Sequence, residues 1–90
     1  MRSAIDQYII DQVRERRLKL RVSQETLAYS LGFESKGYIG AIESMNSDRD
    51  ECYNSKHLNE ISKILKCSPK DFWPDEHLKE YISTRLEENK

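Results

Sequence analysis

The sequence has little of what marks large, extracellular or membrane-embedded proteins. Its 90 residues are too few for a barrel or a full dinucleotide-binding sheet, so we expect one small domain. Two cysteines are too few for a disulfide scaffold, which favours a reduced, cytoplasmic protein. No apolar run approaches the roughly 18–20 residues of a membrane span, and residues 1–6 do not resemble a secretory signal. We therefore expect no membrane partner.

A large excess of one charge is also missing. Fifteen Lys and Arg residues face sixteen Asp and Glu residues, so the net charge is −1 at pH 7. The distribution is uneven, because residues 14–21 (the basic strip) read RERRLKLR while residues 71–90 are mainly acidic. A local basic strip can attract phosphate on a nearly neutral molecule. The alternative is a solvated helix face, where charge runs are common.

Apolar residues recur at the spacing of helices. Ile5, Ile9 and Val13 follow one another at four-residue steps, and the pattern predicts an amphipathic helix from about Ala4 to Lys19. Ser23 is a good N-cap for a second, short helix. The apolar face of that helix consists of Leu27, Ala28 and Leu31. Gly32 follows directly, where a left-handed residue is expected to end the helix.

Three later segments are also expected to be helical. A third helix runs from about Lys36 to Ser44 with Ser35 as a possible cap, and a polar loop over residues 45–54 follows it. A fourth helix starts at Ser55 and ends at Cys67, and Pro69 opens a short fifth turn. No segment alternates with a two-residue period. The expected fold class is therefore all-α: a compact five-helix domain over residues 1–74, with a C-terminal tail over residues 75–90 that is also helical.

The segments around Gly32 have a particular order. Residues 24–33 read QETLAYSLGF and residues 38–43 read YIGAIE. They resemble the helix-turn-helix of the phage-repressor-like (Xre/Cro) DNA-binding family, in which Ser-Gln-x-x-Leu-Ala precedes a Leu-Gly turn and Ile-x-x-Ile-Glu. The likeness extends through residues 58–65 and 68–72 and covers about residues 5–74. It implies a lambda-repressor-like fold.

The turn departs from the family pattern. From Gly32 to Ile39 the chain is one residue longer than the usual spacing, which changes the side chains expected to point outward. Gly37 and Gly40 are also unusual there, because each costs about 1 kcal/mol of helix propensity relative to alanine. Close approach to a ligand such as DNA is one reason for them. Close packing against a neighbouring helix, or a later helix start, is the other.

The resemblance implies that the second helix of the motif lies in the major groove of double-stranded DNA. Lys36 would donate to guanine or to a phosphate. Tyr38 would donate to a phosphate or pack on a thymine methyl. The alternatives are a solvated Lys36, a Tyr38 packed on the protein and a Gln24 that supports its own helix. The candidate DNA-binding residues are Arg21, Ser23, Gln24, Ser35, Lys36, Gly37, Tyr38, Ala41 and Lys56.

Two other features of the sequence bear on function. Arg17 and Glu43 stand where the family has an ion pair between its first and third helices, which gives them a structural role. The possible zinc ligands are Cys52, His57, Cys67 and His77, and their spacing fits no compact zinc pattern. No phosphate-binding glycine loop or nucleophile signature occurs. We expect no metal, no cofactor and no enzymatic activity.

The favoured function is a sequence-specific transcriptional regulator, such as a repressor, that binds a palindromic operator as a homodimer. The apolar stripe of the tail consists of Leu78, Tyr81, Ile82 and Leu86. It would supply a dimer contact, or else pack back onto the domain near Trp73. The alternative function is an antitoxin-like interaction module whose tail binds a partner protein.

Overall fold

The structure is a computed structural model that describes residues 2–44 and 50–83. This part of the chain contains no strand. Its elements are α1 (Ala4–Lys19), α2 (Gln24–Ser30), α3 (Gly37–Glu43), α4 (Ser55–Ile64) and the short 3-10 helix η1 (Pro69–Phe72). The Cα radius of gyration is 12.6 Å, near the ~12 Å expected for a compact chain of this length. The predicted all-α class is confirmed, with four α-helices in the described residues and a 3-10 turn in place of a fifth.

α1 forms from signals within its own sequence. The Ser3 hydroxyl accepts a hydrogen bond from the Asp6 amide and caps the first turn. Arg16 and Lys19 lie in the last turn, where positive charge suits the helix dipole. The apolar stripe packs inward, and Val13 is completely buried. These local signals explain why the predicted range from Ala4 to Lys19 is confirmed.

α2 and α3 form a corner around Gly32, which we call the α2–α3 corner. The Ser23 hydroxyl accepts from the Thr26 amide at 2.9 Å and caps α2, as predicted. Gly32 has a φ of 91°, a conformation that favours glycine, so the expected left-handed turn is confirmed. α3 begins at Gly37, and its N-cap is Lys36 rather than Ser35. The Ser35 hydroxyl instead accepts from the Gly37 amide at 3.3 Å, because Ser35 lies one residue before the N-cap position.

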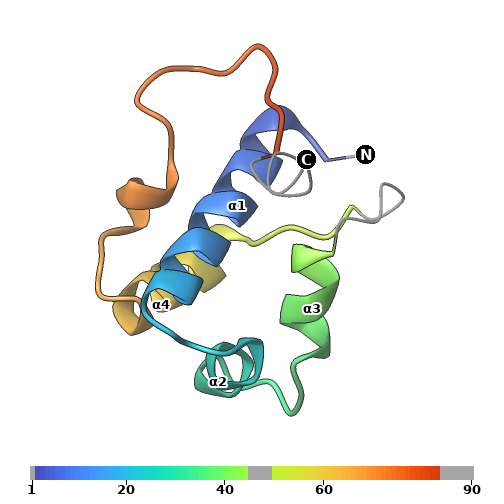
Figure 1. The fold of residues 1–90 in the computed structure, drawn as a ribbon, viewed down its shortest axis with the longest axis vertical. Helices are drawn as coiled ribbons and strands as arrows, with labels where there is room; N and C mark the ends of the chain where they lie inside the picture. Colours follow the sequence, from blue (N-terminus) through green and yellow to red (C-terminus); the bar gives the residue numbers. More distant parts are fainter. Residues whose placement is uncertain (1, 45–49, 84–90) are drawn as a thin grey trace.

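The core lies between the four α-helices and includes Phe72 of η1. In Figure 1, α2 crosses the lower end of the molecule and α3 rises beside α1. α1 packs against α3 and η1, α2 packs against α3 and α4, and α4 packs against η1. Every element contributes to one apolar cluster, which consists of Ile9, Ile10, Val13, Leu27, Ala28, Ile39, Ile42, Tyr53, Leu58, Ile61, Leu65 and Phe72.

The end of the chain corrects two expectations. α4 ends at Ile64 rather than Cys67, because Lys66 adopts a left-handed φ of 57°. Residues 75–83, the described part of the tail, form no helix. They pass around the molecule and return beside the start of α1 (Figure 1), where the Tyr81 hydroxyl donates to Asp11 at 2.8 Å. A short segment with a thin apolar stripe gains little from helix formation unless it packs. Leu86 lies outside the described residues.

Candidate nucleic-acid interface

The predicted groove-facing residues of α3 differ in their exposure to solvent. Ser35, Lys36 and Gly37 are exposed. Tyr38 and Ala41 are half-buried, so most of the surface of each is covered by the protein. On the opposite side of the helix, Ile39, Ile42 and Glu43 are buried and hold α3 to the core. The exposed cation in this set is Lys36.

A buried polar network connects three helices behind the corner. Arg17 of α1 donates two hydrogen bonds to Glu43 of α3, at 2.9 Å to Oε2 and 2.7 Å to Oε1. Both side chains are almost fully buried, so the predicted ion pair is present and its charges are removed from water. Gln24, the first residue of α2, donates from Nε2 to Glu43 Oε1 at 3.2 Å. The network therefore holds the start of α2 against the end of α3.

Tyr38 packs on the protein rather than standing free. Its ring stacks on Phe33 with ring centroids 4.5 Å apart, and its hydroxyl lies 3.0 Å from His57 Nδ1 at the start of α4. Burial, with a smaller contribution from Cys52, raises the pKa of the Tyr38 phenol. Of the two interpretations of Tyr38, packing is the one seen, and the phenol links α3 to α4. The Phe33 ring, in the turn before α3, also meets the His57 ring edge-on with centroids 5.6 Å apart.

The basic strip is not a continuous phosphate-binding face. Arg17 is buried in the ion pair, and Arg16 donates to the Leu65 and Lys66 carbonyl oxygens at 3.0 and 2.9 Å. Arg16 thereby connects α1 to the carbonyl groups of the two residues that follow α4. The exposed cations of the strip are Lys19 and Arg21. The alternative, a fully solvated helix face, is also wrong for Arg16 and Arg17, because both side chains bond to the protein.

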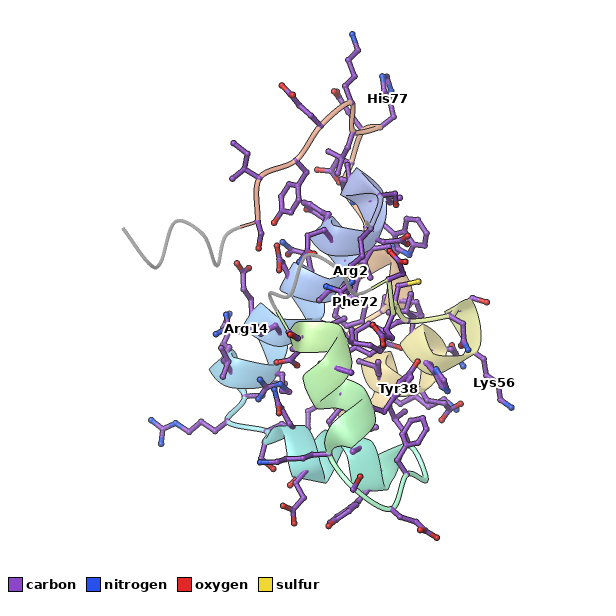
Figure 2. The ribbon with its side chains drawn as sticks, turned by 90° about the vertical axis from the view of Figure 1, so that its right-hand side faces the viewer. Arg2, Arg14, Tyr38, Lys56, Phe72 and His77 are labelled. Atoms are coloured by element: carbon purple, nitrogen blue, oxygen red, sulfur yellow. The ribbon has the colours of Figure 1, made fainter. Side chains whose placement is uncertain are left out.

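The remaining candidates lie at helix starts or just before them. Arg21 is exposed and lies in the turn directly after α1, where its φ is a left-handed 58°. Ser23 is exposed at the start of α2, although its hydroxyl is used as the cap. Lys56 lies in the first turn of α4 and points away from the body of the molecule (Figure 2). Lys56 precedes His57, the residue that contacts Tyr38, so its backbone lies near the contact between α3 and α4.

The two unusual glycines are not demanded by packing. A Cβ on Gly40 would lie 3.6 Å from Gln24 Oε1, an ordinary contact with a movable side chain. A Cβ on Gly37 would lie 3.4 Å from Ser35 Oγ. Close packing against a neighbouring helix therefore does not explain Gly40. A later helix start does apply to Gly37, since Gly37 is the first residue of α3.

The His, Cys, Asp and Glu side chains are scattered over residues 2–44 and 50–83. No group of three or more His, Cys, Asp or Glu side chains that could hold a metal ion occurs there. A shallow cleft of about 270 Å³ between α1 and η1 contains Cys67. Burial raises the pKa of the Cys67 thiol, which disfavours the nucleophilic thiolate. In the same residues no helix is long and apolar enough to cross a membrane.

Comparison with known proteins adds no relative. No family model matches the chain, and neither the curated proteins nor the solved structures contain a significant match. The functional assignment therefore rests on the residues and contacts described above.

Proposed function

We propose that this chain is a sequence-specific DNA-binding transcriptional regulator of the Xre/Cro helix-turn-helix type, with a lambda-repressor-like fold. The observation that carries the proposal is the α2–α3 corner, in which the buried Arg17–Glu43–Gln24 network orders both helices while the start of α3 stays exposed. Gly32 provides the sharp turn that such a corner requires. A corner whose two helices are fixed by a buried network, and whose second helix has an exposed start, suits insertion of that helix into a groove.

In this proposal some exposed side chains contact DNA bases and others contact the DNA phosphates. Lys36 at the start of α3 donates to guanine O6 and N7, the commonest specific contact in the major groove. Arg21 and Lys56 face phosphates on either side of it, and the amides at the start of α2 add a further anion contact. Ala41, which is partly exposed, would meet a thymine methyl. Tyr38 supports α3 through Phe33 and His57 and does not itself read a base.

The regulator acts as a homodimer on a palindrome, since one helix-turn-helix reads about half a site. The described part of the tail contributes less to dimerisation than its apolar stripe suggests. Tyr81 is committed to α1, where its ring meets Tyr8 edge-on at 5.3 Å between centroids. Ile82 is 68% exposed and Trp73 is 48% exposed, so these two side chains are the better dimer contacts.

The same exposed pair supports the second candidate, an antitoxin-like module that binds a partner protein. Trp73 and Ile82 are large apolar side chains in water, and aromatic residues are enriched at protein interfaces. The net charge of −1 also gives no general attraction to DNA. On this alternative, DNA binding is secondary or lost.

In vitro selection of random duplex DNA at physiological salt tests the proposal. Salt matters because phosphate contacts alone retain DNA at low ionic strength. We expect enrichment of an inverted repeat, and we expect Lys36→Glu to bind the selected duplex more than tenfold more weakly. Lys70→Glu, an exposed charge reversal on η1, is the matched control and should bind normally. A folded wild-type protein that enriches no sequence contradicts the proposal and favours the partner module.

A further inference from the structure

Arg2 joins three segments that are far apart in the sequence. Its Nη2 donates to the Ala41 carbonyl and its Nη1 to the Ser44 carbonyl, both at 3.3 Å. Its Nε donates to the Glu51 carbonyl at 2.7 Å, and Nη1 also lies 3.4 Å from Gln7 Oε1. In Figure 2 the Arg2 side chain lies at the end of α3 that is opposite the exposed Lys36. The guanidinium therefore caps the C-terminal end of α3 from outside the helix.

α3 has little within its own sequence to hold it. It is seven residues long, and Lys36 makes no side-chain cap hydrogen bond at its start. Its last turn contains no basic residue that would complement the dipole. Isolated helices of this length are not stable in water, so α3 depends on contacts from elsewhere. Arg2 supplies a positive charge and several donors at the end that lacks them.

We propose that Arg2 is a positioning residue for DNA recognition. It holds the C-terminal end of α3 against the start of α1 and the segment before α4, and so sets the angle at which the first turn of α3 meets the groove. This inference rests on the proposed function. A small rotation of α3 would misplace the base-reading groups and leave the phosphate contacts of Arg21 and Lys56 in place. Arg2 thus acts on specificity more than on general affinity for DNA.

The chain offers a matched control in Arg16. Arg16 donates to the carbonyl oxygens of Leu65 and Lys66, directly after α4, as Arg2 donates to carbonyl oxygens at the end of α3. α4 belongs to the scaffold and presents no base-reading residue in the proposed complex. Loss of the Arg16 contacts should affect folding without affecting base discrimination.

The test compares Arg2→Ala, Arg2→Lys and Arg16→Ala in the full chain. Binding is measured to the selected duplex and to an unrelated duplex, and amide hydrogen exchange is measured for residues 39–44. We expect Arg2→Ala to lower affinity for the selected duplex about tenfold and to leave affinity for the unrelated duplex within twofold. Exchange in residues 39–44 should accelerate. Arg2→Lys should recover part of both effects, because an ammonium group serves fewer carbonyl groups.

Two results overturn the inference. The first is equal loss of affinity for both duplexes, which would make Arg2 a phosphate contact. The second is unchanged exchange in residues 39–44, or the same acceleration in Arg16→Ala, which would remove any particular link to α3. Failure of the proposed function is separate and visible in the wild type, which would then enrich no DNA. The hydrogen-exchange comparison still decides whether Arg2 holds α3.

Discussion

α1 and α3 both belong to the same small core, yet they are stabilised in different ways. α1 has sixteen residues, a Ser3 cap and basic residues in its last turn. α3 has seven residues, no side-chain cap at its start and no basic residue in its last turn. α3 is instead held by Arg2, by Arg17 through Glu43 and by His57 through Tyr38, all from other segments. The helix proposed to read DNA therefore depends more on distant contacts than α1 does.

The largest effect is expected where this dependence is buried. Glu43→Ala leaves the Arg17 guanidinium buried without its carboxylate, which should cost roughly 3–5 kcal/mol of unfolding free energy. Urea denaturation followed by circular dichroism measures it. The control is Glu60→Ala, which removes the exposed pair with Lys63 and should cost less than about 1 kcal/mol. Equal losses in the two variants would mean that α3 has no special dependence on its ion pair.

A smaller effect is expected at Tyr53, which packs near Tyr38 just before α4. Its hydroxyl is buried and has no hydrogen-bond partner among the residues that the structure describes. Tyr53→Phe should therefore raise the unfolding free energy, by about 1 kcal/mol, because it removes an unsatisfied polar atom. Thermal melts at pH 7 measure the gain. A clear loss of stability would show that the hydroxyl is satisfied in solution, for instance by a water molecule.

The same tyrosine gives a pH dependence. Burial raises the pKa of Tyr53 above its usual value of 10.0. The folded state therefore keeps the phenol neutral, and its stability is intact below about pH 10. Above that pH the unfolded chain ionises first, so wild-type stability should fall by about 1.4 kcal/mol per pH unit from this group. Alkaline denaturation should therefore occur at higher pH in Tyr53→Phe than in the wild type or in the exposed control Tyr29→Phe.

The smallest effect sharpens the comparison within α3 itself. Gly40→Ala should stabilise the fold by about 0.5–1 kcal/mol, because alanine is the better helix former and its Cβ has room. Gly32→Ala should instead destabilise the fold, since a φ of 91° strains any residue with a side chain. Differential scanning calorimetry of the two variants tests the pair. Destabilisation by Gly40→Ala would mean that Gln24 cannot shift to accept the methyl group.

Much of the architecture could be predicted because its signals are local. The bounds of α1 follow from one unbroken apolar period, and the turn at Gly32 follows from a glycine after a short amphipathic helix. The exposure of Lys36 was also expected. Two expectations were wrong for different reasons. Ser35 does not cap α3, because its hydroxyl accepts from the Gly37 amide only two residues later. Residues 75–83 are not helical, and Tyr81 in that segment donates to Asp11, 70 positions away.

The candidate interface shows the same division. Sequence alone identified the corner, its capping serine and its exposed lysine, and the family pattern suggested the Arg17–Glu43 pair. The roles of the other arginines had no local signal. Arg16 and Arg2 each end on carbonyl groups roughly forty or more positions away, so neither periodicity nor composition reveals them. Tyr38 likewise needed the structure, because its stacking partner and His57 become neighbours when the turn folds back.

By itself the sequence determined where the four α-helices lie, where the sharp turn falls and which of their faces are apolar, because these depend on neighbours within a few positions. The tertiary structure decided which charges are exposed and which hold helices together. A charged side chain can end in water or on a distant carbonyl group, and that choice depends on the packing of the whole chain. The five cations of the basic strip look alike in the sequence, yet Arg17 is buried in the core and Arg21 is exposed to solvent.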